Sequence, residues 1–114
     1  MEVKRFVEDV SWTPHPVVAG VQVKPLVTQR EHSAAVTCML VKIPVGKDVP
    51  EHIHADQDDI LFPLEGSGVM WVDGTGEFPL TPGMVVRVPK GVRHKIGQVT
   101  EELVVYDVFS PYLI

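Results

Sequence analysis

The 114-residue sequence predicts a single all-β domain, either a sandwich or a barrel with a buried interior. Its apolar runs are short, rich in β-branched residues and separated by glycine, proline and aspartate, which is typical of strands joined by turns. Ten prolines and nine glycines disfavour long helices, and no segment keeps a helical apolar period between capping residues. A chain of this length is long enough for one hydrophobic core.

Six segments are predicted strands, in chain order 21–27, 34–43, 60–64, 69–72, 84–88 and 103–109. Turn signals separate them at 44–46, 65–68, 73–74, 81–83 and 89–91. Asp73-Gly74 predicts a β-hairpin, because glycine tolerates the positive φ that such a turn requires. Pro63 has no N–H to donate to a sheet ladder, so it indicates an edge position or a bulge in its strand.

The chain divides into an N-terminal arm, residues 1–20, and a β-barrel domain, residues 21–114. The arm is expected to cross the barrel or a neighbouring subunit. Trp12 in the arm and the apolar residues 112–114 are not expected to be simply exposed, and apolar surface of this kind usually marks an interface. We therefore predict a homodimer.

Charge and hydropathy narrow the classes of partner. The net charge is −5, and no basic cluster is present to neutralise phosphates, so nucleic acid is not an expected partner. No apolar run is long enough for a transmembrane helix, so no membrane association is expected. The first residues lack the apolar core of a signal peptide, which predicts a cytoplasmic protein.

Three histidines and one carboxylate are candidate metal ligands. His52 and His54 are two residues apart, so on a strand both imidazoles point to the same face. Asp59 follows on the next extended stretch, and His94 could arrive from a neighbouring strand. Imidazoles with one carboxylate suit Mn, Fe, Co, Ni, Cu or Zn. On these residues alone, a metal site and a solvated acidic turn both remain open.

The spacing of two segments resembles the two sequence motifs of the cupin superfamily. The first segment matches at Gly46, His52, His54 and Gly66, with Asp59 where glutamate is usual. The second segment matches at Gly83, Pro89, Gly91 and His94, with Gln98 where asparagine is usual. The resemblance implies a jelly-roll barrel, also called a double-stranded β-helix, that holds one divalent transition metal ion per chain. It also implies the ligands, which are His52, His54, Asp59 and His94.

Aspartate in place of glutamate affects the fourth ligand. The side chain of Asp59 is one methylene shorter, so from the same backbone position it reaches about 1.5 Å less. We expect Asp59 to bind the ion weakly or through a water, and the three histidines to be the main ligands. His15 and His32 lie outside both motifs and are expected at the surface. Arg87 is expected to face outward or toward a partner subunit; facing inward, it would anchor an anionic substrate.

Two functions are compatible with these residues. The first is a metal-dependent enzyme acting on a small organic substrate, because a shortened carboxylate leaves coordination positions open for catalysis. Within this class the resemblance covers dioxygenases, decarboxylases and isomerases, of which we favour a dioxygenase; no general base beyond the candidate ligands is assigned. The alternative is a non-catalytic module that binds a small molecule or a metal. Turnover of a candidate substrate with metal present would separate the two.

Overall fold

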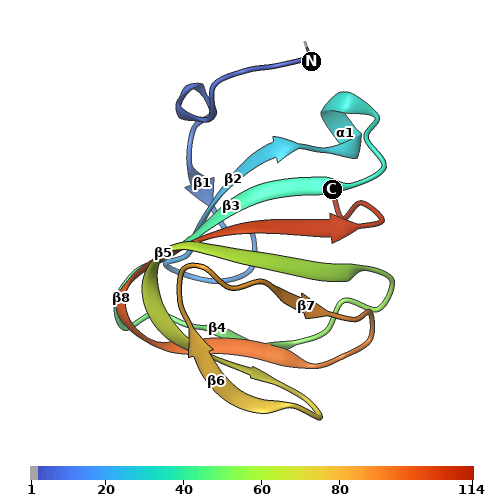
Figure 1. The fold of residues 1–114 in the computed structure, drawn as a ribbon. Coiled ribbons are helices and arrows are strands. Elements are labelled where there is room, and N and C mark those ends of the chain that lie inside the picture. Colours follow the sequence, from blue (N-terminus) through green and yellow to red (C-terminus); the bar gives the residue numbers. More distant parts are fainter. Residues whose placement is uncertain (1–2) are drawn as a thin grey trace.

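The computed structural model describes residues 3–114 and confirms the all-β prediction. One antiparallel sheet with eight strands among the described residues folds over into a jelly-roll barrel of two facing layers (Figure 1). The strands are β1 (Thr13–Pro14), β2 (Gln22–Val27), β3 (Thr37–Ile43), β4 (Val49–His52), β5 (Asp58–Val72), β6 (Gly76–Leu80), β7 (Val86–Val88) and β8 (His94–Ser110). The helical elements are two short pieces, η1 (Val7–Asp9) and α1 (Gln29–His32).

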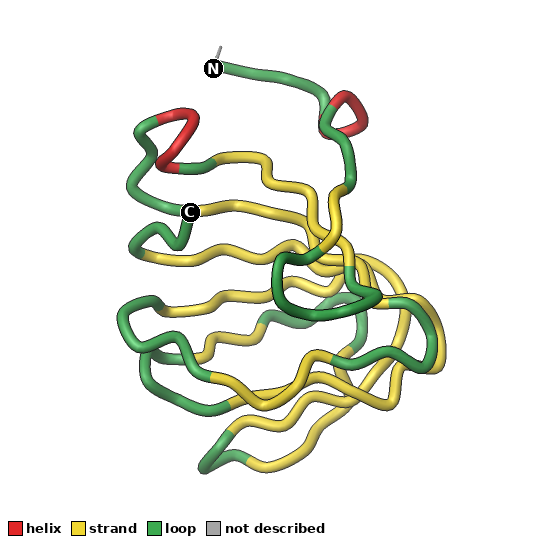
Figure 2. The backbone as a smooth tube through the Cα atoms, turned by 180° about the vertical axis from the view of Figure 1, so that it is seen from behind, coloured by secondary structure: helices red, strands yellow, loops and turns green. Residues whose placement is uncertain are grey.

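Two long strands, β5 and β8, belong to both layers. Their pairing runs from Asp58↔Ser110 to Val72↔His94. One layer has the order β1-β2-β3-β8-β5-β7, and the other has the order β4-β8-β5-β6. The layers are therefore joined through continuous hydrogen-bonded backbone, and the loops lie mainly at the ends of the barrel (Figure 2).

The bend in β5 corrects one prediction. Segments 60–64 and 69–72 are a single strand, and the turn predicted at 65–68 is instead a bend with repeated register shifts against β8. Gly66 has a φ of +89°, and a Cβ there would collide with the Glu102 carbonyl oxygen, so glycine lets the strand bend close to its neighbour. Pro63 lies at the first register shift, which confirms the predicted irregularity.

The hairpin predicted at Asp73-Gly74 is confirmed. It joins β5 to β6 with Val72 opposite Gly76, and the Thr75 N–H donates to the Val72 carbonyl at 3.0 Å. Gly74 has a φ of +83°, as the turn requires. The predicted strands 34–43 and 84–88 begin later than expected, at Thr37 and Val86.

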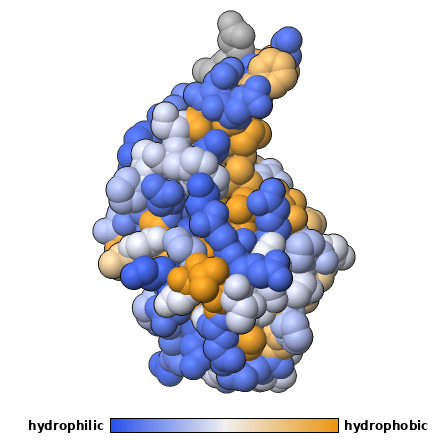
Figure 3. All heavy atoms as spheres, turned by 90° about the vertical axis from the view of Figure 1, so that its left-hand side faces the viewer, coloured by the Kyte–Doolittle hydropathy of each residue, from blue (hydrophilic) through white to orange (hydrophobic). Residues whose placement is uncertain are grey.

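The N-terminal arm crosses the edge of its own barrel. Its strand β1 pairs antiparallel with β2, with Thr13 opposite Val23. Lys24 Nζ donates to the Val7 carbonyl at 3.1 Å. The Trp12 ring lies against the ammonium groups of Lys24 and Lys42, whose Nζ atoms are 4.9 and 4.2 Å from the ring centroid. In Figure 3 the arm stands above a barrel surface on which hydrophilic side chains surround small hydrophobic patches.

The hydrophobic core lies between the layers and is built from the inward-facing side chains of alternating strand positions. Its fully buried members include Ile43, Met70, Leu80, Leu103 and Val105. A second, smaller cluster of Val23, Met39 and Phe109 packs with Ile114 beside it. Within residues 3–114, none of the helices is long and apolar enough to cross a membrane.

Candidate metal centre

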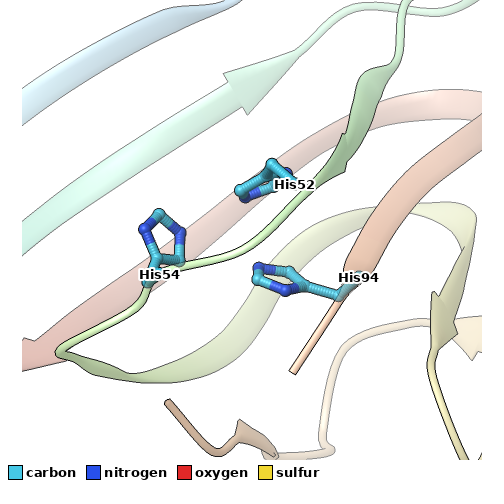
Figure 4. Close-up of side chains that lie close together, drawn as sticks. All are labelled: His52, His54 and His94. Carbon is cyan, nitrogen blue, oxygen red and sulfur yellow. The ribbon is translucent and has the colours of Figure 1, made fainter. Parts of the chain in front are cut away.

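The three candidate imidazoles meet inside the barrel (Figure 4). His52 ends β4, His94 begins β8, and the two residues are directly opposite each other in the sheet. His54 follows in the connection to β5. The candidate ligand atoms of these three residues all lie within 4.8 Å of one another. Nitrogen–metal bonds of about 2.1 Å allow at most about 4.2 Å between two ligands of one ion, so the trio is close to the spacing that an ion imposes.

Hydrogen bonds fix the orientation of two of these rings. His52 Nδ1 lies 2.8 Å from the Pro50 carbonyl oxygen, and His94 Nδ1 lies 3.0 Å from that of Val92. A carbonyl only accepts, so each Nδ1 carries the hydrogen and each Nε2 keeps a lone pair. His94 Nε2 is buried without a hydrogen-bond partner among the described residues. Metal-binding histidines are held in this way, so the residues present fit an ion.

Two of the imidazoles, those of His52 and His54, favour the neutral, metal-binding form. Burial lowers the pKa of His52 and of His54. The neighbouring imidazoles lower both pKa values further, because two positive charges in this space would repel each other. The opposing effects, from Pro50 on His52 and from Asp59 on both rings, do not reverse the shift. Less competition from protons favours metal binding.

Asp59 lies beside two of the three imidazoles. Its Oδ2 is 3.3 Å from His94 Nε2 and 3.7 Å from His54 Nε2, and the residue is 3% exposed. Among the described residues, the set whose candidate ligand atoms all lie within 4.8 Å of one another consists of the three histidines and does not include Asp59. Direct or water-mediated binding by Asp59 stays a prediction.

A second buried carboxyl group, which the sequence analysis did not identify, accompanies Asp59. Asp107 on β8 is 7% exposed, and burial together with a hydrogen bond to Asp59 raises its pKa well above the usual range. Burial alone would also raise the pKa of Asp59, but the hydrogen bond with Asp107 and the adjacent imidazoles of His94 and His54 outweigh it and lower that pKa. A proton shared by this pair therefore sits on Asp107, the group that takes it up more readily, and Asp59 is the one that ionises more readily next to the imidazoles.

His15 is the second residue that the sequence analysis misplaced. It was expected at the surface, but it lines the same cavity as the three candidate ligands. The backbone N–H groups of Val17 and Val18 both donate to its Nδ1 at 3.0 Å, so its hydrogen sits on Nε2. Burial, and then proximity to His52, lower the pKa of His15. His32 is also not a surface residue, because its largely buried ring accepts from the Thr28 N–H at 2.9 Å.

The three-histidine centre opens into a cavity of about 700 Å³ between the layers. Its walls combine strand residues with the arm segment 15–19 and with Leu113 and Ile114 near the C-terminus. A cavity of this size is typical of small-molecule sites. The fold and the site thus define a small β-barrel protein whose interior joins a three-histidine centre to a ligand-sized chamber.

Comparison with known proteins identifies the family. Residues 39–109 match the model of the cupin domain, and the chain belongs to the cupin family. A protein of Streptomyces coelicolor, described as uncharacterised, is 36% identical over 72 residues, which are 63% of this chain and 67% of the relative.

Similar solved structures support the same fold. KdgF from a Halomonas species has a TM-score of 0.79 at 23% identity, covering 93% of this chain and 92% of its own. An RmlC-like cupin from Shewanella frigidimarina has a TM-score of 0.79 at 21% identity, covering 97% and 92%. The polyketide cyclase RemF from Streptomyces resistomycificus has a TM-score of 0.82 at 17% identity, covering 96% and 80%. At these identities the likeness shows the fold alone.

Proposed function

We propose that this protein is a metal-dependent enzyme that converts a small organic substrate inside its barrel. The supporting observation is the convergence of His52, His54 and His94 at the edge of a large cavity, with hydrogen bonds that leave Nε2 of His52 and His94 free. One divalent transition ion per chain would be held by these residues, with Asp59 beside them. The ion when bound supplies Lewis acidity and coordination positions for substrate.

The residues around the centre would set the charge, the proton supply and the access of water during a reaction. The ionised Asp59 balances part of an ion's charge, and Asp107 keeps a proton within reach of that carboxylate. The apolar walls keep bulk water away from the reacting atoms. We favour an oxygen-dependent oxidation over decarboxylation or isomerisation, because three imidazoles with a weak fourth ligand leave several coordination positions open.

Metal content and oxygen consumption test this proposal. Protein purified without chelator is assayed for bound metals, stripped, and reloaded separately with Fe(II), Mn(II), Ni(II) and Zn(II). Each form is then incubated with a panel of small organic acids while oxygen uptake and product formation are followed. Turnover that returns with one metal supports the enzyme. Stoichiometric binding of metal and ligand with no conversion of any panel member supports the alternative, a non-catalytic binding module.

We also propose a homodimer, on grounds that differ from those in the sequence. Trp12 contacts lysines of its own chain, and Ile114 packs in its own core, so neither requires a partner. The outer face of β3, β8 and β5 instead carries Leu40, Tyr106 and Phe62 side by side in register. The same apolar face of a second copy would cover it.

Sedimentation at roughly 10–50 μM, a range in which an interface of ordinary size persists, is expected to show a dimer. Phe62→Lys is expected to shift the protein to a monomer, because it places a charge on the apolar face. Val45→Lys, at an exposed position outside it, is the control. A wild-type monomer under these conditions would end the proposal.

A further inference from the structure

The side chains that line the cavity beside the candidate metal centre fall into two groups, one of histidines and acidic residues and one of apolar residues. Its polar side chains are four histidines and four aspartates or glutamates. The other lining residues are apolar, and among the described residues that form the walls there is no lysine, arginine, serine, threonine, asparagine or glutamine. Before any ion binds, the interior therefore offers no fixed cation and few neutral hydrogen-bonding groups.

The cationic side chains around this part of the fold are engaged by other groups, and the exposed Arg93 pairs with Glu51 of the lining at 3.9 Å. Arg87, which would have anchored an anion had it faced inward, lies outside and forms an ion pair with Asp58 at 2.9 Å. Lys24 and Lys42 lie against the Trp12 ring of the arm. A negative group of a bound molecule can therefore be neutralised only where the metal centre stands.

A second anionic group, or a chain of hydroxyls, would find no partners in this cavity. A carboxylate or phosphate away from the ion would lie against aliphatic walls or near the carboxylates of Asp48 and Glu51, which is unfavourable. Sugar hydroxyls would lose water without gaining enough hydrogen bonds in return. The lining thus selects against dicarboxylates, sugar acids and sugar phosphates.

The apolar wall begins directly at the metal centre. The Phe109 ring packs edge-on against His54, with ring centroids 5.0 Å apart, and Phe109 continues into the cluster with Val23 and Met39. Ile114 completes this wall, and it is held in place because its N–H and that of Leu113 donate to Thr37 Oγ1 at 3.1 and 2.9 Å. The chamber has room for roughly twenty water molecules, far more than a two-carbon acid needs.

We infer that the substrate carries a single anionic oxygen headgroup, which sits at the metal centre, and an uncharged aromatic or branched hydrocarbon body, which packs on the wall of Val23, Met39, Phe109 and Ile114. This inference rests on the proposed function, because the headgroup needs the ion held by the histidines. The body is recognised by the chain itself, through apolar contact and the absence of a second cation.

Three acids with the same headgroup and different bodies test the inference. They are phenylpyruvate with an aromatic body, 2-oxoglutarate with a second carboxylate, and pyruvate with a methyl group. Binding to the Zn(II)-loaded protein is measured by calorimetry, so no turnover is needed. Phenylpyruvate is expected to bind at least tenfold more tightly than either of the others. Equal or tighter binding of 2-oxoglutarate, or no binding of any of the three, would overturn the inference.

Two variants localise the effect. Val17→Lys adds a cation at an exposed residue of the cavity lining, where folding is not at risk, and is expected to raise the affinity for 2-oxoglutarate relative to phenylpyruvate. Met39→Ala removes part of the wall and is expected to weaken the binding of phenylpyruvate several-fold while leaving the binding of pyruvate unchanged. Val45→Ala, at an exposed residue outside the cavity, is its control. An unchanged preference in both variants would also count against the inference.

Metal content, measured on every sample, keeps the two proposals apart. A protein that takes up no ion refutes the proposed function itself. A protein that takes up zinc but does not prefer the apolar acid refutes only the substrate class.

Discussion

The imidazole side and the carboxylate side of the candidate centre are built in different ways. His52 and His94 face each other across β4 and β8, and each donates its Nδ1 hydrogen to a carbonyl two residues earlier in its own chain segment. Asp59 and Asp107 lie on β5 and β8 and depend on each other, each with an oxygen that has no hydrogen-bond partner among the described residues. The orientation of these two imidazoles is set by the local backbone, whereas each carboxyl group depends on its partner across the paired long strands.

This difference predicts that the imidazoles hold the ion and the carboxylates adjust how firmly it is held. Replacing His52 and His94 together by alanine leaves at most two of the candidate ligands, so bound metal is expected to fall from about one ion per chain to nearly none. Elemental analysis after purification measures the loss. His32→Ala, which removes a histidine outside the centre, is expected to retain the metal. Unchanged metal in the double variant would remove the basis of the proposed function.

On the carboxylate side, Asp59→Ala is expected to weaken metal binding about 10- to 100-fold, the usual loss when a partner of the ligands is removed, equivalent to roughly 1.4 to 2.7 kcal/mol. Chelator competition measures it. The control is Asp58→Ala, because the neighbouring side chain faces out and pairs with Arg87. A loss as large as that of a single histidine-to-alanine change would show that Asp59 binds the ion directly.

The shared proton is tested by changing Asp107 in two ways. Asp107→Asn keeps a donor for the Asp59 carboxylate, whereas Asp107→Leu leaves that buried charge without one. The leucine variant is expected to lower the free energy of unfolding by about 1–3 kcal/mol, and the asparagine variant by clearly less. Urea denaturation of the metal-free protein at neutral pH gives both values. Equal losses would mean that the hydrogen bond does not matter.

The smallest expected effect is a pH dependence from the imidazole side. Burial lowers the pKa of His52 and His54 in the folded metal-free protein, so as pH falls the unfolded chain binds protons first. Their contribution to stability is thus complete above the unfolded pKa of 6.5 and is lost as pH falls below it.

A double variant isolates this contribution. Between roughly pH 8 and pH 5.5, the free energy of unfolding of the wild type is expected to fall more steeply than that of the His52→Gln, His54→Gln protein. The single variant Val45→Gln, at an exposed position without a titratable group, is expected to keep the wild-type slope. Identical slopes in all three proteins would contradict the prediction.

The same contrast explains what the sequence could predict. The imidazoles were identified because their spacing, from Gly46 to His54 and from Gly83 to His94, is local and reflects turns and strand starts. Asp107 was missed because its role depends on the pairing of β5 with β8. Its signal was present, since Leu103, Val105, Asp107 and Phe109 alternate inward and only the aspartate breaks the apolar series.

Two other errors have the same physical origin. The Gly-Ser-Gly stretch at 66–68 was interpreted as a turn, because local sequence does not tell whether a glycine ends a strand or lets it bend against a neighbour. His15 was placed at the surface because nothing near it in the sequence shows that the arm folds back beside the cavity. In each case the deciding contact joins residues far apart in the chain.

The continuity of β5 and β8 through both layers has a mechanical consequence. Two separate sheets could move apart to admit a ligand. Here such a movement would break the hydrogen bonds between β5 and β8, the two strands that the layers share. The two layers therefore form a rigid framework around the cavity. A ligand that enters or leaves has to pass the edge of this cavity. There, residues 15–19 and Leu113 are held by a few hydrogen bonds and not by the pairing of central strands. These segments, and not the barrel strands, would set the rates of ligand binding and release.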